Sequence, residues 1–259
     1  MFIDSHCHLD RLDLTPFEGE FASFMREARA QQIEHMLCVS IDLDSYSEMR
    51  RLVDGYDDVS VSVGVHPNEQ VSREPSVEEL VVLAENDKVV AIGETGLDYY
   101  RSSGSLDWQR ERFRQHIRAA KIVGKPLIIH SREAKDDTIN VLKEEGADQV
   151  SGVFHCFTED WETARQVLDL GFFISFSGIV TFRNAQSIQE VARMIPEDRF
   201  LIETDSPYLA PIPFRGKPNY PFYVRHVAQC VAELKGISIE RVAELSSDNF
   251  FRLFPGARA

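Results

Sequence analysis

The sequence predicts an α/β fold, a single (β/α)8 barrel that spans residues 1–259. Eight short apolar runs, often rich in Val, Ile and Phe, recur along the chain, and such runs suit parallel strands buried on both faces. Segments with helical spacing lie between these runs, and the length of 259 residues matches the roughly 250 of a typical barrel. The expected strands cover residues 2–5, 35–40, 59–64, 89–93, 126–130, 152–155, 172–176 and 200–203.

Two segments illustrate the helical spacing. Apolar residues recur at i, i+4 and i+7 in the first, and at i, i+3, i+4 and i+7 in the second, which predicts amphipathic helices with one buried face. These residues are Phe113, Ile117 and Ala120, and then Val224, Val227, Ala228 and Val231. An open doubly wound sheet is the alternative architecture. No G-x-G-x-x-G motif follows the first expected strand, which disfavours a dinucleotide-binding fold.

Composition narrows the function classes. The formal net charge of −14 argues against broad, non-specific binding of duplex DNA, which needs many Lys and Arg side chains on phosphates. A small anionic substrate or one strand end remains compatible with a locally positive pocket. No apolar run is long enough to span a membrane, and the first residues lack the features of a signal peptide. The four cysteines follow no metal-binding or CxxC spacing, so we expect reduced thiols and a cytoplasmic location.

The first expected strand leads into Asp4-Ser5-His6-Cys7-His8. Side chains two residues apart on a strand point the same way, so His6 and His8 can reach one metal ion while Cys7 faces the other side. An H-x-H pair alone is weak evidence, because short motifs often occur by chance.

Further metal-binding side chains fall at the ends of other expected strands. Glu94 ends the run that begins at Val89, His130 and His155 end the fifth and sixth runs, and Asp205 follows the eighth. The loops at the carboxyl ends of barrel strands converge, and active sites form there. A polar residue that caps a turn would explain any one of these positions but not all of them together. The sequence therefore predicts a metal site at this end of the barrel.

The number of candidate ligands exceeds the three protein ligands of a single catalytic zinc. We expect two divalent cations that share one carboxylate, and the ligand types permit zinc, manganese or magnesium. His66 follows the third expected strand on the same rim and is interpreted as a substrate contact, although a ligand role stays open. His35, at a strand start, and His116 and His226, within helices, are interpreted as structural or solvated.

Several segments together resemble a known family. FIDSHCHLD, GVHPN, IGETGLDYY, PLIIHSR, GVFHCF and IETDSPYLAP closely resemble, in order and spacing, the TatD-type metal-dependent deoxyribonucleases of the amidohydrolase superfamily. The resemblance extends from residue 2 to about residue 221. It implies a distorted (β/α)8 barrel, dependence on divalent metal ions and hydrolysis of phosphodiester bonds in DNA. The metal ligands that it implies are His6, His8, Glu94, His130, His155 and Asp205.

We expect these ligands to form two groups that share Glu94: His6, His8 and Asp205 for one ion, and His130 and His155 for the other. Asp205 is the candidate to accept a proton from the attacking water. Glu203 lies two residues earlier, and it either orients that water or supports the ligands as a buried carboxylate.

Basic and aromatic side chains of the rim loops are candidates for contacts with DNA. Donors for phosphate and rings for stacking on an unpaired base are both expected there. The candidates are Arg132, Arg215 and Lys217 for phosphate, and Tyr99, Phe157 and Tyr208 for stacking. The acidic composition favours single strands or strand ends, so we expect an exonuclease. Two alternatives stay open: a hydrolase of the same superfamily acting on an ester, lactone, amide or aminoacyl ester, and a metal-binding partner protein without turnover.

Overall fold

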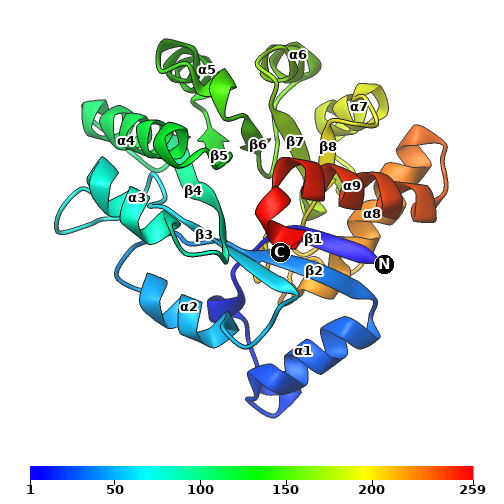
Figure 1. Ribbon diagram of the computed structural model, residues 1–259. Helices are drawn as coiled ribbons and strands as arrows, with labels where there is room; N and C mark the ends of the chain where they lie inside the picture. Colours follow the sequence, from blue (N-terminus) through cyan, green and yellow to red (C-terminus); the bar gives the residue numbers. More distant parts are fainter. Residues whose placement is uncertain (259) are drawn as a thin grey trace.

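The computed structural model describes residues 1–258, which form a barrel of eight parallel strands hydrogen-bonded in chain order. The helices surround the strands, so the predicted fold class is confirmed (Figure 1). The strands are β1 Phe2–Cys7, β2 Ile33–Cys38, β3 Val59–Val63, β4 Val89–Asp98, β5 Leu127–Arg132, β6 Gly152–Phe154, β7 Phe173–Phe176 and β8 Phe200–Ile202. The α-helices are α1 Phe21–Ala30, α2 Tyr46–Val53, α3 Val77–Ala84, α4 Asp107–Val123, α5 Lys135–Glu144, α6 Trp161–Asp169, α7 Gln186–Met194, α8 Val224–Lys235 and α9 Ile239–Leu253. No helix within residues 1–258 combines the length and apolar character that crossing a membrane requires.

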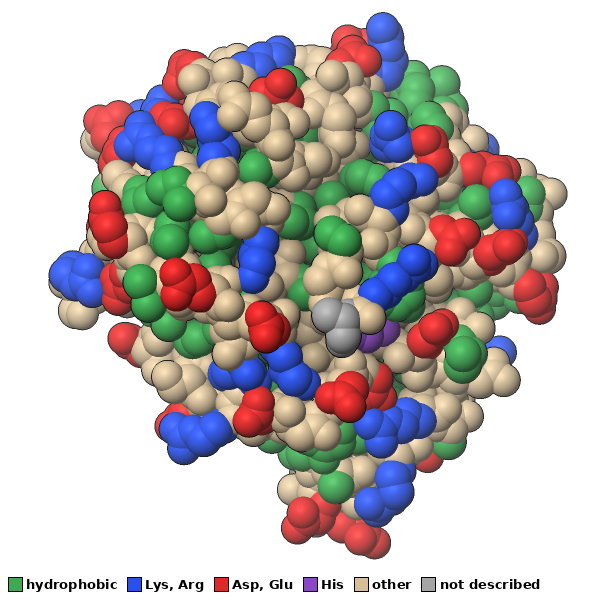
Figure 2. All heavy atoms as spheres, in the orientation of Figure 1, with side chains coloured by type: hydrophobic (Ala, Val, Ile, Leu, Met, Phe, Trp, Pro, Cys, Tyr) green, Lys and Arg blue, Asp and Glu red, His purple; other side chains and the backbone are tan. Residues whose placement is uncertain are grey.

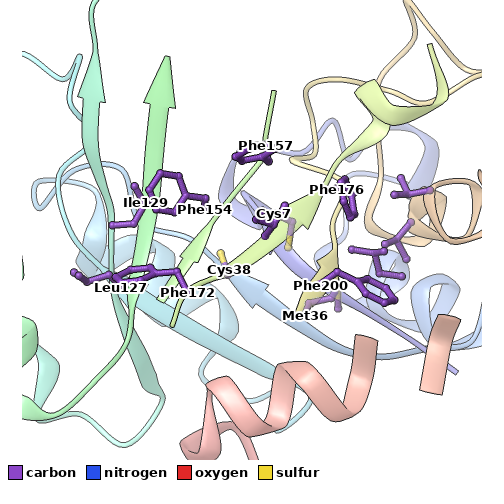
Figure 3. Close-up of a cluster of buried hydrophobic side chains, with 14 of the residues drawn as sticks. Cys7, Met36, Cys38, Leu127, Ile129, Phe154, Phe157, Phe172, Phe176 and Phe200 are labelled. Atoms are coloured by element: carbon purple, nitrogen blue, oxygen red, sulfur yellow. The ribbon is translucent and has the colours of Figure 1, made fainter. Parts of the chain in front are cut away.

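Strand side chains alternate between two hydrophobic clusters. Along β5, Leu127 and Ile129 join the cluster that the surrounding helices share, whereas Ile128 joins the cluster inside the barrel. Figure 3 displays part of the helix-side cluster, including Leu127, Ile129 and Phe172. This alternation follows from the two-residue period of a strand, and it explains why the strands read as nearly continuous apolar runs.

Helix α9 closes the amino-terminal end of the barrel. Its residues Phe250 and Leu253, and Phe254 directly after the helix, belong to the interior cluster together with Ile3 and Leu201 from the strands. In Figure 1 the helix crosses in front of the strands, close to the amino terminus. Basic and acidic side chains are interspersed over this face of the molecule (Figure 2). Helix α9 thus covers one end of the barrel interior and leaves the opposite, carboxyl-terminal end to the loops that follow the strands.

The barrel closes where β1 meets the segment after β8. A regular ladder does not join the two strands; Cys7 and Ser206 form a single isolated bridge. The buried carboxylate of Asp4 accepts hydrogen bonds from the backbone N–H and the hydroxyl of Thr204. Side-chain hydrogen bonds thus complete a joint that the backbone ladder leaves irregular.

Strand β4 is longer than the sequence predicted. The expected strand ended at Gly93, but β4 continues through Glu94 to Asp98, with a register irregularity between Ile92 and Thr95. Gly93 and Gly96 allow the strand to continue because its backbone approaches that of β5 closely, and a Cβ on Gly96 would clash with the carbonyl oxygen of His130. Glu94 therefore lies inside a strand rather than at its end.

We predict that His116 makes stability sensitive to acid. Its Nδ1–H donates to the Arg112 carbonyl at 2.8 Å and its Nε2 accepts the Val65 N–H at 3.0 Å, an arrangement open only to the neutral ring. Burial lowers the pKa of His116 from 6.5 to about 4. The unfolded chain then binds a proton before the folded one, so stability present above pH 6.5 is lost as the pH falls toward 4, on the order of 3 kcal/mol in total.

Denaturant titrations of the chelator-treated protein between pH 7 and 4 measure this dependence. The free energy of unfolding should fall less steeply with decreasing pH in His116→Gln than in the wild type. His226→Gln, which changes a partly exposed imidazole on α8, is the control and should keep the wild-type slope more closely. Equal slopes for His116→Gln and the wild type would contradict the prediction.

Candidate metal centre

A cavity of about 570 Å³ opens at the carboxyl-terminal end of the barrel. Its walls come from loops that follow most of the strands, and they combine imidazoles, carboxylates and guanidinium groups. The lining includes His8, Arg11, His66, Asn68, Glu94, Asp98, Arg101, His130, Arg132, His155, Asp205 and Tyr208. This is the end at which the sequence predicted the site.

The first two histidines face the site because β1 changes phase along its length. Phe2 and Cys7 would lie on opposite faces of a regular strand, yet both belong to the helix-side cluster. An irregularity in the pairing with β2 between Asp4 and Cys7 accounts for the change. His6 and His8 are consequently on the opposite side from Cys7, as predicted.

His6, His8 and Asp205 form one group of potential ligands. The Asp205 Oδ1 atom lies 3.6 Å from His6 Nε2 and 3.4 Å from His8 Nε2. His8 donates from Nδ1 to the carbonyl of Val39 at 3.0 Å, which leaves the lone pair on Nε2, the nitrogen nearest Asp205. Asp205 has a φ of 57°, a left-handed conformation that short polar residues tolerate and that often occurs at functional sites.

Glu94 connects this group to a second one. Its Oε2 atom lies 3.4 Å from His6 Nε2, whereas its Oε1 atom lies 2.9 Å from His155 Nε2 and 3.0 Å from His130 Nδ1. The rings of His6 and His155 stack with 3.9 Å between their centroids. One carboxylate therefore faces imidazoles on both sides.

Two further carboxylates hold the imidazoles of the second group. Glu203 Oε1 lies 3.3 Å from His155 Nδ1 and accepts the N–H of Cys156 at 2.8 Å. Asp98 Oδ2 lies 3.1 Å from His130 Nε2. A carboxylate on one ring nitrogen orients the ring and directs the other nitrogen to a metal. The buried position of Glu203 favours the supporting role over orientation of the water.

Sequence reasoning missed Asp98. Asp98 was not among the candidates because the fourth strand was expected to end at Gly93. A strand that continued past Glu94 would carry Glu94, Gly96 and Asp98 on one face, and this alternation was the signal that could have revealed it.

Electrostatics keep Glu94 and Asp205 ionised. Burial alone would raise the pKa of Glu94, but His155 and His66 hold it well below its usual value. Burial also opposes ionisation of Asp205, yet the hydrogen bond with His8 lowers its pKa. In turn, burial alone would lower the pKa of His155, and the charge of Glu94 raises it well above the usual value. Ionised oxygens thus face imidazoles whose protons a divalent cation would displace on binding.

His6 provides a separate test of whether a metal fits. Both of its ring nitrogens are buried, and neither has a hydrogen-bond partner within residues 1–258. A buried polar atom without a partner costs free energy and calls for an explanation. A cation on Nε2, beside Glu94 and Asp205, would satisfy that nitrogen, so the residues fit a metal centre.

The predicted substrate contacts divide into two sets. His66, Arg132 and Tyr208 line the cavity, and Tyr208 is 50% exposed with its ring 6.0 Å from that of His8. Burial lowers the pKa of His66 to about 3, so its ring is neutral at pH 7.

The other candidates do not line the cavity within the described part of the chain. Arg215 lies over the ring of Phe182, and Lys217 is exposed on the same loop. Tyr99 donates its hydroxyl to Asp137 and is not among the residues that line the cavity. A stacking role for Phe157 is wrong, because the ring is only 4% exposed and packs in the helix-side cluster (Figure 3).

The structure adds two arginines that the sequence did not indicate, because Arg11 and Arg101 line the cavity together with Arg132. Tyr100 is more exposed than Tyr99, at 57%, but within the described residues it does not line the cavity either, and the Arg132 guanidinium lies 3.9 Å from its ring centroid. Neighbouring tyrosines in an irregular loop have no fixed period, so no pattern distinguished them.

The remaining histidines have structural surroundings, as predicted. His35 is buried, and its Nε2 lies 2.8 Å from the hydroxyl of Ser60. His226 is partly exposed on α8 beside Phe214 and Tyr223.

Comparisons with known proteins agree with this geometry. The family described as "TatD related DNase" matches residues 3–255. An uncharacterized metal-dependent hydrolase of Escherichia coli, YcfH, is 49% identical over 97% of this chain and 95% of its own length. YabD of Bacillus subtilis, also an uncharacterized metal-dependent hydrolase, is 40% identical over 98% of this chain and 99% of its own. The crystal structure of YjjV, a TatD homologue of Escherichia coli, superposes with a TM-score of 0.90 at 27% identity and covers 98% of both chains. The chain is therefore a metal-dependent hydrolase that belongs to the family of TatD related DNases.

Proposed function

We propose that the protein is a deoxyribonuclease that hydrolyses phosphodiester bonds, acting on single strands or strand ends with a pair of divalent cations. The observation that carries the proposal is the position of Glu94, whose two oxygens face different imidazoles: His6 on one side, His130 and His155 on the other. A carboxylate in this position suits two cations that share it.

His6, His8 and Asp205 would hold one cation, and His130 and His155 the other. Such a pair, when bound, lowers the pKa of water and stabilises negative charge on phosphate oxygens. The Asp205 carboxylate is held ionised and is partly exposed to the cavity, so it can accept the proton that the attacking water loses. Glu203 and Asp98 keep the imidazoles of His155 and His130 oriented.

The rim offers contacts for a strand of DNA. Arg101 and Arg132 line the cavity and can donate charge-assisted hydrogen bonds to phosphate oxygens. Tyr100 and Tyr208 are exposed rings on which an unpaired base can stack. These local positive charges lie in a chain of net charge −14, which disfavours long contacts along a duplex.

We predict that Glu94→Gln removes both the metal pair and the activity. The amide keeps the shape of the side chain but loses the charge that two cations would share. Metal content after saturation should fall from close to two ions per chain, and the rate of hydrolysis should drop by more than about a hundredfold. Elemental analysis and a rate assay on a single-stranded oligonucleotide measure the two quantities.

The matched control is Glu111→Gln, on the exposed side of α4, which should keep both metal content and rate. Circular dichroism establishes that both variants are folded. A Glu94→Gln protein with wild-type metal content and rate would refute the bridging role.

We also predict that the enzyme shortens single-stranded DNA from an end faster than it cuts blunt duplex. The scissile phosphate would have to enter the cavity and reach the side chains that would hold the cations, which is easier for an unpaired, flexible end. Time courses with end-labelled single-stranded and duplex oligonucleotides, at matched low salt, should give a ladder that shortens by single nucleotides.

A closed circular duplex offers no end and should resist cutting under the same conditions. Equal cutting of that circle would contradict end-directed cleavage. A carboxylic ester assayed in parallel tests the alternative substrate class, and hydrolysis of the ester without hydrolysis of DNA would overturn the proposed function.

A further inference from the structure

His66 lies among the metal-binding side chains but differs from them in its hydrogen bonding. Its Nε2 lies 3.5 Å from Glu94 Oε1, and His66, Glu94 and His130 are close enough together to hold an ion. However, the N–H of Asn68 donates to Nδ1 of His66 at 3.1 Å. A nitrogen that accepts a hydrogen bond carries the lone pair, so the proton of the neutral ring is on Nε2. The nitrogen that faces the site is therefore a donor.

The neighbouring histidines have the opposite arrangement. His8 has the Val39 carbonyl next to Nδ1, and His155 has the Glu203 carboxylate there. Acceptors at Nδ1 fix the proton on that nitrogen and leave the Nε2 lone pair for a metal. His66 has a donor at the same position, and its Nε2 cannot bind a cation without losing its own proton.

Helix α4 fixes the loop that carries His66. Gln109, Arg112 and His116 are buried and follow one another at i, i+3 and i+7, so they share a face of the helix. His116 Nε2 accepts the N–H of residue 65, and Gln109 Nε2 donates to the carbonyl of residue 67 at 3.1 Å. Two polar side chains of this helix thus bind backbone groups of residues 65 and 67, on either side of His66.

Arg112 makes the largest share of these contacts. Its Nη1 donates to the carbonyls of His66 and Glu69, each at 2.9 Å. Its Nε and Nη2 form a bidentate pair with Glu74 at 2.6 and 2.7 Å, and Trp108 lies over the guanidinium. A planar guanidinium with five fixed donors suits this arrangement, and an ammonium group cannot reproduce it.

We propose that His66 is a hydrogen-bond donor to an anionic oxygen of the substrate rather than a metal ligand, and that Arg112 is the residue that positions it. The His66 side chain is 18% exposed and lines the cavity, so its Nε2–H can reach a bound phosphate. The phosphate partner rests on the proposed function, whereas the protonation of the ring and the metal content do not.

Nuclear magnetic resonance of ¹⁵N-histidine-labelled protein tests the first part without substrate. Long-range ¹H–¹⁵N correlations identify which ring nitrogen carries the proton, and His66→Gln assigns the signals. His66 should keep its proton on Nε2 before and after loading with Zn²⁺, while the nitrogen signals of His8 and His155 shift on loading. A metal-induced shift of His66 Nε2, or loss of metal from His66→Gln, would overturn the proposal.

A double-mutant cycle tests the positioning role. Arg112→Lys should lower kcat/KM for a single-stranded oligonucleotide by roughly tenfold to a hundredfold at unchanged metal content, because a small displacement of a substrate contact has effects of this size. In a His66→Gln background the same change should cost no more than roughly twofold, since the contact is already absent. Equal losses in both backgrounds would refute positioning through His66.

Two further variants complete the design. Arg114→Lys changes an arginine of the same helix that pairs with Glu144, and it should leave kcat/KM unchanged. If Arg112→Lys does not fold, Gln109→Met removes the donor to the carbonyl of residue 67 and takes its place in the cycle. A protein inactive on phosphodiesters would refute the proposed function, and the resonance and metal measurements would still decide the state of His66.

Discussion

The hydrogen bonds that join the first strand to the segment after the last strand are the constraint on which the site depends. Asp4 accepts from Thr204 across 200 residues of sequence, and the N–H of Asp205 donates to the carbonyl of His6 at 2.9 Å. These contacts join residues about 200 positions apart, so no short segment of the chain can form them by itself. Closing so long a loop costs chain entropy, which the pairing of the intervening strands must offset. The candidate metal centre is therefore a property of the closed barrel and of no smaller part of it.

Two irregular strands then decide which side chains enter the site. The phase of β1 changes between Asp4 and Cys7, and that of β4 changes between Ile92 and Thr95. Without the first change, His6 would share the face of Phe2 and point toward the helices. Bulges of this kind redirect side chains next to active sites, at a local cost in ladder hydrogen bonds. The positions of His6 and Glu94 thus depend on departures from regular strand geometry.

Much of this arrangement could be predicted, and the exceptions have physical causes. Parallel strands share one polarity, so the expectation that His130 and His155 converge at one end of a barrel needed no knowledge of the strand irregularities. Asp98 was missed because the fourth strand was expected to end at Gly93, whereas β4 continues to Asp98. The expected stacking role of Phe157 was wrong because the direction of a loop side chain has no period, and this ring is buried. The direction of a loop side chain depends on how distant segments of the chain pack against it, and no periodic sequence pattern reports that packing.

Helix α9, which covers the amino-terminal end of the barrel, limits the routes by which substrate and product can enter and leave the cavity. Phe250 and Phe254 fill that end, so within the described part of the chain the barrel has a mouth and no exit. A strand of DNA could therefore not pass through the barrel from one end to the other. Under the proposed nuclease activity, each released fragment would leave by the route along which the remaining strand enters, so product and substrate would occupy the same space in turn.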